Sequence, residues 1–438
     1  MTGAPREQWA SRLGFLLAAV GSAVGLGNMW RFPYLTAEHG GAAFVALYLL
    51  VTLVIGLPVM LAEFVVGRGA RRSPIGALIH FGGRAWRPLG WLFVASGFLI
   101  LAYYSVIAGW TLRYALAGLA GGFPEDASAF FGAVASGPAA IAWHVIFMGL
   151  TIAIVAGGVR SGIERTSLVL MPLLFVLVIG LALYAATLDG GSPGYRFYLA
   201  TDFREILSFE VLNAAAGQAF FSLSLGMGAM LTYASYLSHH EHLPNGALVV
   251  VLCDFGVAFV AGLAVFPMIF ALGLSGEVAE STVGALFITL PRAFAGMGGA
   301  GRVVGVLFFI VLAVGALTSA ISLLEVVVAS AMDRLGWARP FAAVLLGLAV
   351  TLLGIPAALS LDVLGCMDQI AGNFFLVLGG LMLAIFVGWV MRDPMVEAHK
   401  GAEGVRWFFL WRWLLRIPVP LVLAVVLYYS LRALAGQG

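Results

Sequence analysis

The chain has 438 residues, of which 62% are hydrophobic and only 10% are charged, with a formal net charge of +2. This composition excludes a soluble globular protein and indicates an all-α polytopic membrane protein. The sequence contains no basic patch interleaved with aromatic residues, so we expect no nucleic-acid partner. We expect the chain to be surrounded by membrane lipid.

Apolar runs long enough to cross a bilayer predict about eleven transmembrane helices. They cover residues 12–37, 42–66, 89–119, 140–157, 165–188, 211–237, 245–273, 302–332, 340–356, 369–391 and 414–434. Cys253 and Cys366 both fall within such runs, so we expect no disulfide framework.

Arginine is concentrated in alternate loops between these runs. The loops after the second, fourth, eighth and tenth runs carry Arg68, Arg71, Arg72, Arg84 and Arg87, then Arg160 and Arg165, then Arg334 and Arg339, then Arg392, Lys400 and Arg406. The positive-inside rule therefore predicts a cytoplasmic N-terminus. The dominance of arginine over the single Lys400, with short termini, suggests a bacterial source and hence a bacterial inner membrane.

The first apolar run contains an unusual segment, GSAVGLGNMWRFP, over residues 21–33. Each of its three glycines weakens a helix by about 1 kcal/mol relative to alanine, so we expect a break near 24–27. A break at bilayer depth is tolerated where it lines a cavity or is buried in protein. Its free amides and carbonyls could bind an ion or a charged solute; close helix packing through small residues is the alternative.

The sixth run has a matching segment, QAFFSLSLGMG, over residues 218–228. Five runs separate the two segments, so the second set enters the membrane from the opposite side. Broken helices in corresponding positions are typical of inverted-repeat transporters with a site at mid-membrane. We therefore predict a 5+5 inverted repeat with broken helices 1 and 6: residues 1–188 form the first repeat, 189–391 the second, and 392–438 a loop and an additional helix 11.

The residues from Arg6 to Tyr34 include the run GLGNMWRFPY and resemble the signature of the neurotransmitter:sodium symporter family. The resemblance continues through residues 38–44, 56–58 and Glu63, and returns at 103–104, 218–236, 317–320 and Asp368. It implies the LeuT-type fold and sodium-coupled symport of amino acids or related amines. The chain lacks the twelfth span common in the family; several bacterial members also stop at eleven.

A zwitterionic substrate needs free amides and a hydroxyl for its carboxylate, which Gly25, Leu26, Gly27 and Tyr104 can supply. For Tyr104, interfacial anchoring or packing is the alternative. The resemblance implies amino-group acceptors at the carbonyls of Ala23, Phe221 and Ser224. It implies a side-chain pocket of Ile100, Phe221, Ser224, Met227, Ser319 and Leu323. This pocket is uncharged and has an adaptable methionine where many members carry phenylalanine, so we expect a neutral, bulky or aromatic amino acid.

Sodium prefers oxygen ligands, which broken helices expose. The resemblance implies two sodium sites. One uses Ala23, Asn28, Ser222 and Asp254. The other uses Gly21, Val24, Gly315, Thr318 and Ser319; for the last two hydroxyls, bonding to their own i−4 carbonyls is the alternative.

Asp254 stands where the family more often has asparagine, and an acid within a membrane is functional by default. Tyr48, Gln218 and Ser222 match three chloride-site positions, while Ala258 replaces a further oxygen ligand. One local anion can balance the sodium charge, so we expect chloride not to be required. A proton on Asp254 during the return step is left open.

The resemblance also implies gates. Arg31 and Asp368 form an outer pair with Phe221 as a lid, and Arg6 and Asp333 form an inner pair near Trp9 and Tyr236. Snorkelling ends and surface pairs of little value are the alternative. Gly162 and Pro172 bracket the start of the fifth run and predict a segment that unwinds; an ordinary kink is the alternative.

The sequence disfavours two other classes of function. A transporter-like sensor that binds amino acid without carrying it is disfavoured by the intact inner-gate residues and by both sodium sites. An intramembrane hydrolase is disfavoured because no Ser/His or paired-Asp pattern falls at membrane depth, so we expect no enzymatic activity.

Overall fold

The computed structural model describes residues 7–200, 209–274 and 282–434, and every regular element within these ranges is a helix. Nine helices in the described part are long and apolar enough to cross a membrane. A tenth crossing is formed by the pair Arg12–Ala23 and Gly27–Glu38, which is bent by 46° at its break. The predicted all-helical membrane fold is confirmed.

The first half of the chain contains ten α-helices. They are α1 (Arg12–Ala23), α2 (Phe32–Glu38), α3 (Ala42–Val51), α4 (Leu57–Ala70), α5 (Pro74–Gly82), α6 (Arg87–Ala120), α7 (Ala127–Ala135), α8 (Gly137–Ala156), α9 (Arg165–Ala185) and α10 (Ser192–Leu199). Wider π-helical turns at Gly27–Arg31, Thr52–Gly56 and Val159–Glu164 precede α2, α4 and α9.

The second half continues with twelve α-helices. They are α11 (Phe209–Ser222), α12 (Ala229–Ala234), α13 (Leu243–Ala271), α14 (Thr282–Gly284), α15 (Leu290–Gly296), α16 (Gly298–Leu335), α17 (Arg339–Leu359), α18 (Leu361–Asp368), α19 (Leu376–Ile385), α20 (Pro394–His399), α21 (Phe408–Arg416) and α22 (Pro418–Leu434). Helices α18 and α19 form one span, Leu361–Val390, with π-helical segments Gln369–Phe375 and Phe386–Val390.

The sixth predicted span is not among these ten crossings, because neither of its two helices is long enough to cross a membrane alone. It is divided into α11 and the six-residue α12, with residues 223–228 in turns between them. The position of the break matches the predicted segment at 218–228. The division into repeats at residues 188 and 391 is not tested by helix positions and stays a prediction.

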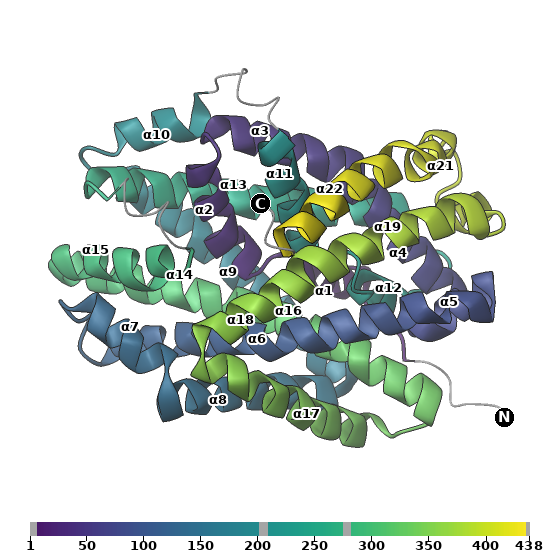
Figure 1. The fold of residues 1–438 in the computed structure, drawn as a ribbon, viewed down its shortest axis with the longest axis horizontal. Helices are drawn as coiled ribbons and strands as arrows, with labels where there is room; N and C mark the ends of the chain where they lie inside the picture. The colour runs from purple at the N-terminus through teal and green to yellow at the C-terminus, as the bar shows by residue number, and fades with distance from the viewer. Residues whose placement is uncertain (1–6, 201–208, 275–281, 435–438) are drawn as a thin grey trace.

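Helices α6 and α16 form the central packing pair, with 34 and 38 residues. At 1.5 Å per residue they are about 50 Å and about 57 Å long, which exceeds a bilayer core of about 30 Å. Figure 1 shows them crossing the middle of the molecule, with α7 and α15 at one end and α5 and α21 at the other. The breaks in the first and sixth spans lie between these ends.

Candidate transport site

The break in the first span is created by side chains that divert two backbone amides. The Gly25 N–H donates to Asn28 Oδ1 at 2.9 Å, and the Leu26 N–H donates to the Tyr104 hydroxyl at 3.2 Å. In a continuous helix these amides would bond to the carbonyls of Gly21 and Ser22. Those two carbonyl oxygens instead face α16 and the sixth span.

Hydroxyl groups meet the freed carbonyls. Ser319 Oγ lies 3.3 Å from the Gly21 oxygen and 3.2 Å from the Ser22 oxygen, and Ser224 Oγ donates to the Ser22 oxygen at 2.7 Å. A Cβ atom on Gly25 would lie 2.4 Å from Ser319 Oγ and 2.8 Å from the Tyr104 hydroxyl. Any larger residue at this position would therefore have to displace the hydroxyls of Ser319 and Tyr104.

The break in the sixth span is stabilised differently, by a carboxylate from α4. Glu63 is fully buried and accepts hydrogen bonds from the Gly226 N–H at 2.9 Å and the Leu231 N–H at 3.0 Å. Gly226 has φ +78°, and its Cβ would lie 2.1 Å from the Leu376 oxygen. The turn therefore needs glycine both for its conformation and for its contact with α19.

The two breaks enclose a cavity with about 20 Å³ of free space. It is lined by Ser22, Ala23, Gly25, Gly27, Ile100, Tyr104, Phe221, Ser222, Ser224, Met227, Ser319 and Leu323. Ten of the eleven predicted substrate residues are in this set, and the eleventh, Leu26, bonds to Tyr104. Sequence reasoning did not single out Ser22; its side chain donates to Ser322 at 2.7 Å.

Asp254 lies at the edge of this cavity and is fully buried. Its Oδ1 accepts from Asn28 at 2.7 Å and from Ser222 at 2.8 Å, and its Oδ2 accepts from Tyr48 at 3.1 Å. No arginine, lysine or histidine among the described residues forms an ion pair with it. A buried carboxylate that has only neutral donors fits a bound cation, because the cation would compensate its charge.

The residues of the second predicted sodium site also come together. Thr318 Oγ1 donates to the Gly315 oxygen at 3.0 Å and lies 3.2 Å from the Val314 oxygen, as expected for a membrane-helix threonine. A Cβ on Gly315 would lie 3.5 Å from the Val24 oxygen. Carbonyls at the end of α1 therefore face hydroxyls in the middle of α16, a donor set that suits a hard cation.

On the outer side, Arg31 and Asp368 have different partners, and no ion pair joins them in the described chain. Arg31 Nη2 donates to Asn373 Oδ1 at 2.9 Å, and its guanidinium lies 5.0 Å from the centre of the Phe221 ring. Asp368 Oδ1 accepts from the Tyr103 hydroxyl at 2.7 Å. Phe221 therefore separates Arg31 from the central cavity.

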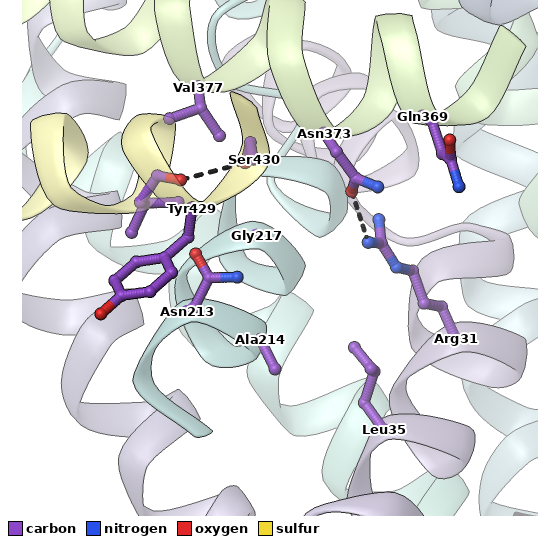
Figure 2. A pocket seen from close by; sticks show the side chains of 11 residues that line it. Arg31, Leu35, Asn213, Ala214, Gly217, Gln369, Asn373, Val377, Tyr429 and Ser430 are labelled. Carbon is purple, nitrogen blue, oxygen red and sulfur yellow. Dashed lines mark hydrogen bonds between the residues drawn. The ribbon is translucent and has the colours of Figure 1, made fainter. Parts of the chain in front are cut away.

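Arg31 also lines a larger outer cavity of about 200 Å³ between α2, α11, α19 and α22. Figure 2 shows Arg31, Asn373 and Gln369 on one side of it, and Asn213, Tyr429 and Ser430 on the other. Its place beyond the Phe221 ring makes it an outer vestibule to the central cavity.

The inner side is closed by packing and by a buried ion pair. Trp9 Nε1 donates to the Tyr233 oxygen at 2.9 Å, and the Trp9 and Tyr236 rings lie 6.3 Å apart. Tyr236 donates to Glu325 at 2.5 Å, and Glu325 pairs with Arg339 at 2.6 Å. Of the predicted inner pair, Arg6 lies outside the described residues, and Asp333 accepts from the Ser73 N–H at 2.6 Å.

Gly162 lies in the π-helical turn before α9, and Pro172 lies within α9. A Cβ on Gly162 would lie 2.0 Å from the Ile154 oxygen. This close approach explains the glycine structurally, so the unwinding role stays a prediction.

Sequence reasoning missed several buried charged residues as site residues, among them Glu63 at the second break. Glu325 and Arg339 form the buried ion pair on the inner side. Arg68 was expected in a loop, but it lies in α4 and is fully buried. Arg68 donates to Glu397 Oε1 at 2.9 Å, and also to the backbone oxygens of Glu397, Glu241 and Lys400. The sequence feature that could have identified these residues is a charged side chain within or beside an apolar run.

A family model described as the sodium:neurotransmitter symporter family matches residues 6–129 and 133–437. The chain belongs to this family. It is 37% identical to YhdH, an uncharacterized sodium-dependent transporter of Bacillus subtilis, over 96% of each chain. It is 33% identical to an uncharacterized sodium-dependent transporter of Methanocaldococcus jannaschii, over 97% of this chain and 90% of the other.

The fold is also similar to a solved structure, the crystal structure of MhsT in complex with L-phenylalanine. The TM-score is 0.89 and the sequence identity 44%, over 97% of this chain and 100% of the other. The chain is therefore a multi-pass, sodium-dependent membrane transporter of the LeuT-type fold, and family membership identifies it as a transporter and not as an enzyme.

Proposed function

We propose that this symporter uses sodium to import neutral, bulky hydrophobic or aromatic L-amino acids by alternating access. The observation that carries the proposal is the central cavity, whose described lining combines the first helix break with apolar side chains and has no charged residue. The amides of Gly25 and Leu26 and the Tyr104 hydroxyl suit a carboxylate, and Ile100, Met227 and Leu323 suit an apolar side chain. MhsT, which has the same fold, was solved with L-phenylalanine.

Substrate binding requires side chains to move. The free space of about 20 Å³ is close to what a single water molecule needs. Phe221 and Met227, two apolar side chains of the lining, can move without losing a side-chain hydrogen bond. A substrate that displaces Phe221 also disturbs its stacking with Arg31, which couples the central cavity to the outer vestibule.

Two sodium ions would be held by the residues described above. Asn28, Ser222, Asp254 and the Ala23 carbonyl would hold one, and the carbonyls of Gly21, Val24 and Gly315 with Thr318 and Ser319 would hold the other. A bound cation would compensate the charge of Asp254 and would be coordinated by the exposed carbonyls, which would favour the broken conformation that also binds substrate. Binding of ion and substrate is therefore coupled.

Chloride is not required in this proposal. Tyr48 and Ser222, two residues at the family's chloride-site positions, donate to Asp254 instead. Their hydroxyl protons are thereby directed at a carboxylate, which leaves no donor pair for a second anion. The fixed charge of Asp254 takes the role of chloride.

We place the transporter in a bacterial inner membrane with a cytoplasmic N-terminus. The support is the arginine asymmetry of the loops. Helices α5 and α21 flank or follow arginine-rich loops and lie at the same end of the molecule (Figure 1).

The test is uptake of radiolabelled amino acids into proteoliposomes, with an inward sodium gradient or with potassium only, and with chloride or gluconate. We expect sodium-dependent accumulation of leucine or an aromatic amino acid that is equal in both anions. Transport of glycine or proline alone would contradict the bulky-substrate proposal. Sodium-dependent binding without accumulation would favour the sensor alternative.

A further inference from the structure

Helix α21, at the start of the last span, has two distinct faces. Phe408, Trp411 and Leu415 are buried against the protein, at the spacing of one helical face. Phe409 and Trp413 on the other side are 77% and 44% exposed. The helix therefore has an apolar outer face at the end of a membrane span, where acyl chains meet headgroups.

Two arginines lie one turn apart on this short helix. Arg412 and Arg416 are at positions i and i+4, so they share a face and repel each other in the absence of an anion. Arg412 Nε is buried and has no hydrogen-bond partner. Neither arginine forms an ion pair anywhere in the part of the chain that is described.

One tryptophan, Trp389, contacts this arginine pair through Arg416. The Arg416 guanidinium stacks on Trp389 at 5.2 Å, its Nε donates to the Gly388 oxygen at 2.8 Å, and Trp389 Nε1 donates to the Arg416 oxygen at 3.2 Å. Trp389 is 61% exposed and Trp407 42% exposed. Exposed tryptophans of this kind mark the headgroup level of a membrane.

Other charges in the same region are mixed. Arg392 and Arg406 are exposed, and so are the acidic residues Asp393 and Glu403. Lys400 is paired with Glu397 at 2.5 Å. Asp393 attracts Arg412 electrostatically without forming an ion pair with it, so the positive charge of Arg412 and Arg416 is only partly compensated. The surface is not simply basic throughout.

We propose that Arg412 and Arg416 bind the phosphate group of an anionic phospholipid, with Trp389 and Trp413 flanking the headgroup. The lipid phosphate lies between two like charges and compensates them, while the exposed apolar residues of α21 contact the acyl chains. This site is independent of the amino-acid and sodium sites. It attaches the turn between the tenth and eleventh spans to the membrane surface.

The experiment compares the full-length transporter in nanodiscs of phosphatidylcholine alone and of phosphatidylcholine with phosphatidylglycerol. Binding of phosphatidylglycerol is counted by native mass spectrometry, and the unfolding temperature is measured in both. For Arg412→Gln/Arg416→Gln we expect about thirty-fold weaker lipid binding, from about 1 kcal/mol for each arginine near the surface. Phosphatidylglycerol should raise the unfolding temperature of this double variant by less than half as much as it raises that of the native chain.

The matched control is Arg432→Gln, at the other end of the same span, which should bind phosphatidylglycerol as the native chain does. An equal unfolding temperature of the double variant and the native chain in phosphatidylcholine would show that the variant is folded; if it is not, Arg412→Gln alone replaces it. Unchanged lipid binding in the folded variant would overturn the proposal. The same stabilisation by inorganic phosphate in phosphatidylcholine would also overturn it, since the site would then be a phosphate site only.

Discussion

The two helix breaks at the centre of the molecule are satisfied by different kinds of group. At the first break, the diverted amides and carbonyls meet neutral partners: Asn28, Tyr104, Ser224 and Ser319. At the second break, two amides share the carboxylate of Glu63. The first break is therefore maintained by neutral hydroxyl and amide side chains, and the second by a buried carboxyl group.

This difference separates binding from support. Neutral hydroxyls and amides can exchange a protein partner for an ion or a carboxylate at little cost, because each contributes only about 1 kcal/mol net. A buried carboxylate that accepts two amides is expensive to release. We therefore infer that groups at the first break exchange hydrogen-bond partners when ligands bind, and that the second break keeps its hydrogen bonds throughout.

The largest effect is expected from Glu63→Ala, which tests the proposed difference between the two breaks. It leaves the Gly226 and Leu231 amides buried without acceptors, which costs about 1–3 kcal/mol for each group, or about 2–6 kcal/mol in total. We expect a large loss of unfolding temperature in detergent, with little folded protein recovered. Glu63→Gln, which keeps one acceptor oxygen, should lose about half as much; equal stability of both variants and the native chain would remove the distinction between the breaks.

The next largest effect is expected from Asp254→Asn. Its three neutral donors lose their charged acceptor, and a sodium ion loses its compensating charge. We expect sodium-dependent uptake in gluconate to fall about 100-fold, equivalent to about 3 kcal/mol for a charge-assisted contact. Chloride should restore part of this loss. A variant that transports equally in both anions, at the native rate, would refute the role given to Asp254.

Gly25→Ala sharpens the comparison at the first break itself. The added methyl group would lie 2.4 Å from Ser319 Oγ and 2.8 Å from the Tyr104 hydroxyl. We expect a loss of about 1–3 kcal/mol in amino-acid binding, measured by scintillation proximity with a labelled substrate. Gly97→Ala in α6 is the control, because its nearest neighbour would be at 3.4 Å; an equal effect of both variants would contradict the argument.

The smallest effect is expected from Tyr104→Phe. It removes the hydroxyl that the Leu26 N–H contacts at 3.2 Å, a neutral bond of about 1 kcal/mol. We expect about five-fold weaker substrate binding. We also expect a lower unfolding temperature, with a smaller loss than in Glu63→Ala, because one buried N–H loses its acceptor instead of two. Tyr114→Phe, ten residues further along α6 and bonded to the Phe287 oxygen, should leave binding unchanged. A loss of stability without a loss of binding would assign Tyr104 a packing role.

The sequence predicted the helical fold and both breaks because their causes are local. Bilayer thickness sets the length of an apolar run, and glycine weakens a helix wherever it stands. The residues around the central cavity followed from the family signature, and ten of the eleven do line one cavity. Their roles toward substrate and sodium stay predictions.

Side-chain partners could not be predicted in the same way, because they depend on the register between distant helices. Arg31 bonds to Asn373, five residues beyond the expected Asp368, since the π-helical segment Gln369–Phe375 turns Asn373 toward it. Arg68 stands at the end of an apolar run and reads as a loop residue. It is buried because α20 and the residues after it pack against it and, with Glu241, supply carbonyl acceptors.

The contact between Ser319 and the Gly21 carbonyl spans 298 residues, and the contact between Asn28 and Asp254 spans 226. Chains are synthesised at about 5–20 residues per second, so the first contact can form only about 15–60 s after Gly21 has been made. Helix α1 therefore enters the bilayer long before its break has partners. The ion-binding centre of this transporter matures late in translation, after α16 has left the ribosome.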